Sequence, residues 1–145
     1  MRGCVFCDIV GGRRDAYVLY EDDSHMAFLD RYPVVPGHAL IIPKTHHSTI
    51  LEMGPERAGR LFALVPLLAP AILHATGTAA FNVGQNNGDA AKQVVPHVHV
   101  HIIPRRPGDQ INWNARAIAD AELFGQMVRS VREYLARYTT VSSGP

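Results

Sequence analysis

Apolar and polar residues alternate along residues 97–102 of the run His-Val-His-Val-His-Ile-Ile, which ends at Ile103. Val98, Val100 and Ile102 occupy every second position, and three histidines stand between them. Because successive side chains of a β-strand point to opposite faces, this pattern predicts a strand with one core face and one imidazole face. Pro104 is expected to end the strand. One interpretation is a half-exposed strand whose polar face happens to be histidine. An imidazole row adds little to packing, however, so this face is the leading candidate for chemistry.

Four further strands are predicted from short runs of β-branched and aromatic residues that lie between turn residues. These runs cover residues 16–20, 25–29, 38–42 and 78–83. A single turn of helix is expected over 48–53. Glycine and asparagine over 84–92 predict a loop that leads into the histidine strand, and an irregular stretch over 105–116 follows that strand.

Two longer helices are predicted from apolar residues at helical spacing. The first covers 55–77, and Pro66 and Pro70 inside it should cause a kink or a break because each removes a backbone donor. The second is amphipathic and covers about 118–138, followed by a loose tail over 139–145.

The composition indicates one globular domain spanning residues 1–145. With 145 residues, of which 47% are hydrophobic, the chain can build a core without disulfide support. The formal net charge of +1 gives no broad field for nucleic acid or membrane surfaces, and no apolar run approaches the length that spans a bilayer. Residues 1–4 lack the apolar core of a signal peptide, so we expect a cytoplasmic location.

The two cysteines, Cys4 and Cys7, stand in a Cys-x-x-Cys pair near the N-terminus. This spacing suits a tight turn that presents two thiolates to one metal ion, and a redox pair has the same spacing. In the cytoplasm, thiols or metal ligands are favoured over a disulfide.

The histidine row suits two chemistries. Binding of one metal by all three imidazoles is disfavoured, because His97 and His101 would lie about 13 Å apart in an extended strand, too far for three zinc bonds of roughly 2.1 Å. Nucleophilic attack at phosphorus fits better, since an imidazole with an ordinary pKa of about 6.5 is largely neutral at pH 7. His99, with a histidine on either side, is the natural nucleophile.

The row matches the His-φ-His-φ-His-φ-φ signature, where φ is apolar, so the chain resembles the histidine triad (HIT) family. Further matching segments are Phe28-Leu29-Asp30, Pro36-Gly37-His38, Ile42-Pro43-Lys44 and residues 82–93. The resemblance is to the nucleotide-binding branch. It implies an α+β fold with an antiparallel sheet, a central helix and a C-terminal helix, a homodimer, and a covalent nucleotidyl-histidine intermediate.

The resemblance also implies roles for individual residues. His99 corresponds to the nucleophile, and His101 to the histidine that contacts the phosphate and assists the leaving group. Asp30 would bind both ribose hydroxyls, although as a turn residue it has a purely structural alternative. Asn86 and Gln93 correspond to polar substrate contacts. An apolar wall around the base, for which plain core is the alternative, is formed by Val5, Phe6, Ile9, Phe28 and Leu40.

Two positions depart from the family pattern just before the row. Lys92 replaces a glycine that usually lets the backbone approach the phosphate. Val94 stands where the family commonly has serine or threonine, so a hydroxyl that could assist a leaving group is missing. A preference for phosphoramidates is therefore less secure than the nucleotidyl-histidine mechanism.

Bacterial members of the family resemble this chain in having Cys-x-x-Cys near the start and Pro-Lys-x-His in the middle. The resemblance implies a Cys₂His₂ zinc site made by Cys4, Cys7, His46 and His97. Four protein ligands leave no position for a substrate water, so the zinc would be structural. Two free thiols or a redox pair are the alternatives. His38 is a candidate support for the triad.

The expected function is a hydrolase or transferase that cleaves the bond to the α-phosphate of purine nucleotides, either phosphoramidates or adenylyl compounds. One alternative is a dinucleoside polyphosphate hydrolase. Another is a nucleotide-binding dimer whose partner contacts matter more than turnover. We expect no organic cofactor and no nucleic-acid or membrane partner.

Overall fold

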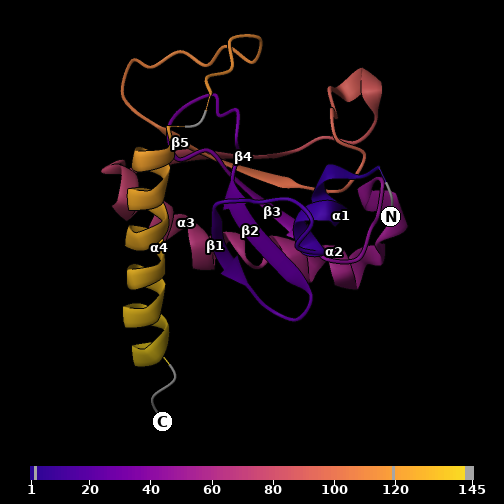
Figure 1. Ribbon diagram of the computed structural model, residues 1–145, viewed down its shortest axis with the longest axis horizontal. Coiled ribbons are helices and arrows are strands. Elements are labelled where there is room, and N and C mark those ends of the chain that lie inside the picture. Colours follow the sequence, from indigo (N-terminus) through magenta and orange to yellow (C-terminus); the bar gives the residue numbers. More distant parts are fainter. Residues whose placement is uncertain (2, 119, 143–145) are drawn as a thin grey trace.

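A five-stranded antiparallel sheet with the strand order β1-β2-β3-β5-β4 forms the centre of the protein (Figure 1). The computed structural model describes residues 1, 3–118 and 120–142. The strands are β1 (Val18–Glu21), β2 (His25–Leu29), β3 (Ala39–Pro43), β4 (Ala80–Gln85) and β5 (Val100–Arg105). The α+β class and the antiparallel sheet expected from the sequence are confirmed.

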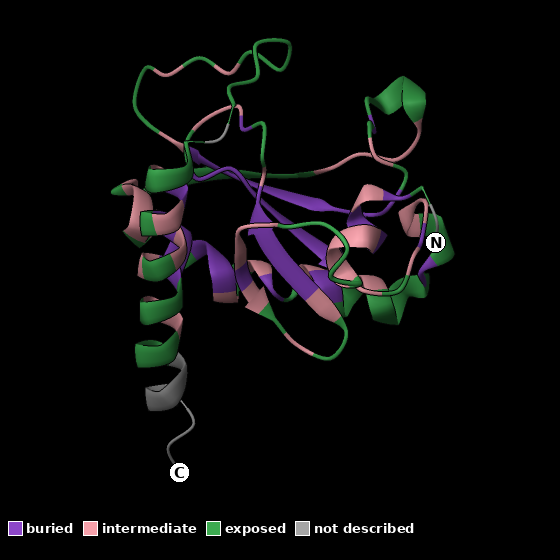
Figure 2. Cartoon of the chain, in the orientation of Figure 1, coloured by how far each residue is buried: buried purple, intermediate pink, exposed green. Residues whose placement is uncertain are grey.

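Helices cover both faces of this sheet. They are α1 (Val5–Val10), η1 (Ile50–Glu52), α2 (Gly54–Phe62), α3 (Val65–Thr76), η2 (Asp89–Ala91) and α4 (Ala121–Ser142). On one face, side chains of α2, α3 and α4 share a core cluster with Val98, Val100 and Ile102. On the opposite face, α1 packs on alternate residues of β2 and β3, such as Phe28 and Leu40. Figure 2 shows the buried sheet between these layers.

The histidine strand differs from its predicted range. β5 begins at Val100, where pairing with β3 begins, and it continues through Pro104 to Arg105. His97 and His99 lie just before it, in a segment that is not part of the strand ladder and whose Val98 N–H donates to the backbone oxygen of His47 at 2.8 Å. A proline is tolerated in a strand where its missing N–H faces no neighbour. At Pro104 the ladder with β3 has already ended at Ile102, so β5 has only β4 beside it.

The predicted helix over 55–77 is broken, as the prolines suggested. α2 ends at Phe62 and α3 begins at Val65, with Pro66 in the first turn of α3, where no backbone donor is needed. An 18-residue window within Gly54–Thr76 nevertheless has a mean hydropathy of 1.6, so this range passes a length and composition test for a membrane span. The expectation that no apolar run reaches such a length is therefore wrong. The physical reason is that α2 and α3 follow one another and both supply apolar residues to the main core, such as Leu61, Leu68 and Ile72.

Other boundaries shift by a few residues. α1 was not predicted as a helix. α4 begins at Ala121 and its backbone remains helical through Ser142, so the tail expected from 139 is wrong as far as 142. Residues 143–145 lie outside the described residues.

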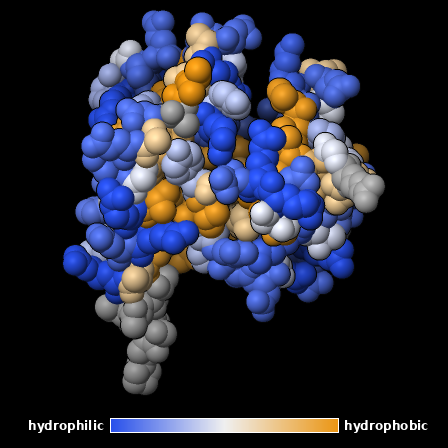
Figure 3. All heavy atoms as spheres, viewed as in Figure 1, coloured by the Kyte–Doolittle hydropathy of each residue, from blue (hydrophilic) through white to orange (hydrophobic). Residues whose placement is uncertain are grey.

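The segment over 106–118 leaves β5 and arches above the sheet before α4 begins (Figure 1). In the same view most of the surface is hydrophilic, and hydrophobic atoms gather beside α4 (Figure 3).

Candidate active site and metal-ligand cluster

All three histidines of the row are buried. His97 is fully covered, and His99 and His101 are each 6% exposed, while Val98 and Val100 point into the main core. The cover on the histidine side comes from α1, whose Phe6 ring meets the ring of His99 edge to face at 5.1 Å between centroids. The alternative of a half-exposed histidine face is thus wrong, because α1 closes that face.

His97 belongs to a cluster of four residues that could hold a metal ion. The ligand atoms of Cys4, Cys7, His46 and His97 all lie within 4.8 Å of one another. Nδ1 of His97 is 3.5 Å from Sγ of Cys4 and 3.6 Å from Sγ of Cys7, and Nδ1 of His46 is 3.3 Å from Sγ of Cys7. Four ligands placed tetrahedrally at zinc bond lengths of about 2.1–2.3 Å would lie roughly 3.4–3.8 Å apart. The cluster therefore fits an ion in tetrahedral coordination whose four positions are all taken by protein ligands.

The protonation of His97 suits metal binding. Its Nε2–H donates to the backbone oxygen of Pro43 at 2.8 Å, because a carbonyl can only accept, so Nδ1 presents a lone pair to the sulfurs. Burial lowers the pKa of His97 to about 4, which keeps the ring neutral. Burial also raises the pKa of the Cys4 thiol, and a divalent cation in the cluster would favour the thiolates. Both cysteines are unpaired by disulfide.

His99 is held in the form that a nucleophile requires. Its Nδ1–H donates to the backbone oxygen of His97 at 2.7 Å. Since the carbonyl only accepts, Nδ1 must carry the proton and Nε2 must carry the lone pair. Burial lowers the pKa of His99, although the hydrogen bond to His97 and the charge of Asp30 oppose that shift. The ring is therefore neutral near pH 7, and a neutral imidazole can act as a nucleophile without a separate base.

His101 is held in the opposite form through a relay that includes His38. The backbone N–H of Val34 donates to Nδ1 of His38 at 3.2 Å, so Nε2 of His38 carries its proton. That N–H donates to Nδ1 of His101 at 2.8 Å, which leaves an N–H on Nε2 of His101. Burial lowers the pKa of His38 to about 2 and that of His101 to about 3. His101 thus offers a donor beside a lone pair on His99, with the two rings 4.9 Å apart.

Asp30 lies next to this relay. Its Oδ2 is 3.6 Å from Nε2 of His38, and its Oδ1 accepts the backbone N–H of Tyr32 at 2.9 Å. Oδ2 also accepts a hydrogen bond from Arg116 at 3.2 Å. Burial raises the pKa of Asp30, although the bonds from Tyr32 and Arg116 lower it. The ligand atoms of Asp30, His38 and His101 also lie close enough together to hold a cation. However, the 2.8 Å between Nε2 of His38 and Nδ1 of His101 is a hydrogen bond, which leaves no lone pair there for a cation.

The five apolar wall residues come together beside His99. Phe6, Phe28 and Leu40 are buried in one cluster, and Val5 and Ile9 are half-buried against it. Phe6 meets Phe28 edge to face at 5.4 Å. The cluster joins α1 to the face of the sheet that carries His101, because Leu40 is the cross-strand partner of His101. These residues are therefore placed both as core and as neighbours of the histidines.

The loop before the row is fixed by its own hydrogen bonds. The amide of Gln93 donates to the backbone oxygen of Ser48 at 2.6 Å and accepts from the N–H of Gly88 at 2.7 Å, so it ties the loop together. Asn86 is half-buried in the same loop. Lys92 has a φ of 67°, in the left-handed region that favours glycine. This explains the glycine of the family pattern through backbone geometry, and Val94, 83% exposed, points to solvent.

Sequence reasoning missed two residues that lie over the histidines. Trp113 packs its ring edge to face on His101 and on His38, at 5.7 and 6.1 Å between centroids. The guanidinium of Arg116 lies 5.2 Å from the centre of the Trp113 ring and bonds to Asp30. Both come from the irregular stretch after β5, where no periodic pattern indicated which side chains turn inward.

Comparison with known proteins agrees with this geometry. The HIT domain model matches residues 12–108. Adenylylsulfatase HINT3 of Arabidopsis thaliana is 42% identical over 137 residues, 91% of this chain and 69% of that protein. Adenosine 5'-monophosphoramidase hnt1 of Schizosaccharomyces pombe is 39% identical over 124 residues, 83% and 90% of the two chains. A Zn-bound histidine triad family protein from Mycobacterium smegmatis superposes with a TM-score of 0.85 at 34% identity, covering 96% and 97%. The chain belongs to the HIT domain family.

Proposed function

We propose that the protein is a nucleotidyl hydrolase or transferase that uses His99 as its nucleophile on the α-phosphorus of purine nucleotides. One observation carries the proposal. The Nδ1–H of His99 is committed to the backbone oxygen of His97 at 2.7 Å, so the lone pair of Nε2 is free to attack. The relatives add the substrate class, because one is named an adenylylsulfatase and two are named adenosine 5'-monophosphoramidases.

In the proposed reaction Nε2 of His99 forms a bond to the α-phosphorus, and the bond from phosphorus to the leaving group breaks with its electron pair. The Nε2–H of His101 donates to the phosphate oxygen on which negative charge develops, or to the departing group. Water then attacks phosphorus, the P–N electron pair returns to His99, and the water proton passes to solvent. The carboxylate of Asp30 accepts hydrogen bonds from the two ribose hydroxyls, and the side chain of Asn86 makes a polar contact with the nucleotide. Gln93 acts by holding the loop, and the wall around Phe6 receives the base.

The leaving group is the less constrained part of the proposal. A serine or threonine hydroxyl at position 94 is absent, and Val94 is largely exposed, so a leaving amine would find no proton donor there. Adenylyl compounds with an acidic leaving group need no such donor, and we favour them over phosphoramidates. A dinucleoside polyphosphate hydrolase and a nucleotide-binding dimer without turnover are the alternatives.

Turnover of three substrates tests the proposal. We expect kcat/KM for adenylyl sulfate to exceed that for adenosine phosphoramidate by about tenfold or more, because a departing amine finds no hydroxyl donor at position 94. Fastest cleavage of a diadenosine polyphosphate would favour the first alternative. Tight AMP binding with no turnover of any of the three would favour the second.

We further propose that the cluster of Cys4, Cys7, His46 and His97 holds a structural zinc ion. The donor set is the soft, four-ligand type that zinc prefers, and no open position would remain for substrate. When bound, zinc supplies a crosslink that fixes α1 to the segment leading into β5. Support comes from the separations among the four ligand atoms and from the similarity to the Zn-bound protein of Mycobacterium smegmatis.

A homodimer is proposed through β4. This strand is at the edge of the sheet and pairs only with β5, and its Phe81 and Val83 are 38% and 42% exposed. An exposed apolar edge strand is a template for another strand, and a second copy offers the same edge. We expect Val83→Lys to yield monomers in light scattering, with Leu51→Lys, on a surface 89% exposed, remaining dimeric. A wild-type monomer at high concentration would contradict the proposal.

A further inference from the structure

The segment over 106–118 is tied down across the catalytic face by contacts near its end. The backbone N–H of Ala117 donates to the oxygen of Pro33 at 3.2 Å. Arg116 donates to the backbone oxygen of Tyr32 at 2.9 Å and to Oδ2 of Asp30 at 3.2 Å. These contacts join the segment to the turn after β2, which carries Asp30. They do not involve the core, so they can open without unfolding the sheet.

Asp30 has one oxygen committed to the backbone and one held by Arg116. Oδ1 accepts the N–H of Tyr32, which shapes the turn, whereas Oδ2 accepts the guanidinium of Arg116. The two side chains are 15% and 29% exposed. A half-covered carboxylate whose pKa is raised by burial gains from a counter-charge, and Arg116 supplies it when no nucleotide is bound.

A ribose diol would compete for the same oxygen. Each carboxylate oxygen can accept two hydrogen bonds, and Oδ1 already accepts one from the turn. A diol that binds both oxygens therefore also reaches Oδ2, where it competes with the guanidinium of Arg116. The freed guanidinium would lose its counter-charge at the moment when the phosphate of the same nucleotide arrives at the histidines.

The freed guanidinium lies within electrostatic reach of those histidines. Besides burial and the charge of His99, the positive charge of Arg116 contributes to lowering the pKa of His101. The Trp113 ring, which packs on His101, also lies against the guanidinium at 5.2 Å. Trp113 therefore holds Arg116 beside the catalytic pair even when the bond to Asp30 is broken.

We propose that Arg116 is an anion-binding residue of the nucleotide site, which Asp30 holds in the empty protein and which the ribose diol releases onto the phosphate. The inference rests on the proposed function, since it assigns the ribose to Asp30. The exchange makes binding depend on both halves of the ligand. Binding of a nucleoside breaks the Asp30–Arg116 ion pair without forming a new one, which weakens the binding. A nucleotide compensates for this loss, because its phosphate forms a new ion pair with Arg116.

Arg116→Gln tests the exchange through two ligands, adenosine and AMP, titrated by calorimetry. The variant removes the competitor for Asp30 and also the charge for the phosphate. Adenosine should bind about threefold more tightly, the size of a partly exposed ion pair. AMP should bind about tenfold more weakly, the size of a charge-assisted hydrogen bond. Trp113, the only tryptophan of the chain, gives an independent fluorescence signal.

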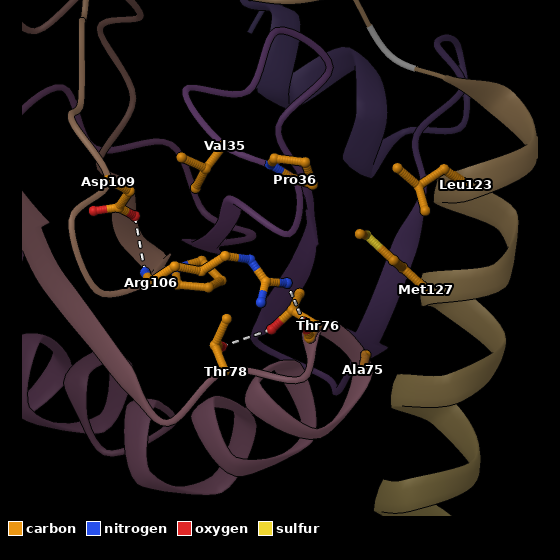
Figure 4. A pocket seen from close by; sticks show the side chains of 10 residues that line it. Val35, Pro36, Ala75, Thr76, Thr78, Arg106, Asp109, Leu123 and Met127 are labelled. Carbon is orange, nitrogen blue, oxygen red and sulfur yellow. Dashed lines mark hydrogen bonds between the residues drawn. The ribbon is translucent and has the colours of Figure 1, made fainter.

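Two further variants serve as controls. Arg116→Lys keeps the charge, so its AMP affinity should stay within about threefold of wild type. Arg106→Gln removes an equal charge from the same segment, where Arg106 donates to the backbone oxygen of Thr76. Arg106 lines a different hollow of about 380 Å³ between α3 and α4, whose lining includes Thr78 and Met127 (Figure 4). The Arg106→Gln variant should therefore leave the affinities for adenosine and for AMP unchanged.

Opposite shifts for the two ligands would support the exchange. If Arg116→Gln binds both adenosine and AMP more tightly, Arg116 only blocks the site. If it binds both ligands more weakly or with unchanged affinity, Arg116 has only a structural role. Either result overturns the inference while leaving the proposed function intact. Failure of the wild-type protein to bind AMP would remove the proposed function and the inference together.

Discussion

Replacement of His99 by asparagine is expected to lower turnover of adenylyl sulfate by about four orders of magnitude, which is the scale of losing a covalent nucleophile. Asparagine has no lone pair at the position of Nε2. Its side-chain amide can still donate to the backbone oxygen of His97, as Nδ1 of His99 does at 2.7 Å. The measurement is single-turnover kinetics, which separates chemistry from product release.

The control for this prediction is His74→Asn, because His74 lies on the exposed side of α3 against Tyr134. It should turn over substrate like wild type. AMP affinity of the His99 variant should stay within about tenfold of wild type, since most contacts to the base and ribose are made elsewhere. Turnover within about tenfold of wild type in the His99 variant would show that another group attacks phosphorus.

Removal of the metal is expected to have the largest effect on stability. Cys7 lies at the centre of the cluster, 3.3 Å from His46 and 3.6 Å from His97. The unfolded chain cannot gather ligands from positions 4, 7, 46 and 97, so the binding free energy of the ion is folding free energy. We expect Cys7→Ser, or treatment with a chelator, to lower the melting temperature by about 10 °C. Metal analysis of the wild-type protein should find close to one zinc per chain.

His47→Asn is the matched control for the zinc prediction. His47 is the neighbour of His46 and is also buried, at 8% exposed, but it is not one of the four ligands. Its substitution should leave the zinc content at one per chain even if packing suffers. A wild-type protein without zinc, in which both cysteines react freely with an alkylating agent, would contradict the assignment.

The alternation of apolar residues and histidines along residues 97–102 made it predictable which side chains face the core and which form the histidine row. Alternation assigned Val98 and Val100 to the core, and the structure places both there with no exposed surface. The limits of β5 were not predictable from the same residues, because they depend on where β3 stops pairing. Likewise Pro104 reads as a strand terminator in isolation, and only the one-sided ladder shows why it is tolerated.

The four residues of the cluster were predicted together through the resemblance to bacterial members of the family, and the structure brings them together, whereas the position of Arg116 was not predicted. Arginine is common on surfaces, and the stretch that carries it has no regular period. Its position depends on a fold-back that brings residues 86 positions apart into contact. The helix α1 was also missed, because its six residues give too short a pattern. The cytoplasmic location stays a prediction.

The alternation along the catalytic segment has a consequence for how the sequence can change in length. Insertion or deletion of one residue within 98–102 would place the imidazoles on the two sides of the change on opposite faces, since side chains change face at each step. The loops on either side of this segment, over 86–93 and 106–118, carry no such constraint, and longer loops cost little free energy. Insertions and deletions should therefore accumulate in these two loops. Substrate range can then diversify by loop length while the spacing of the three histidines stays fixed.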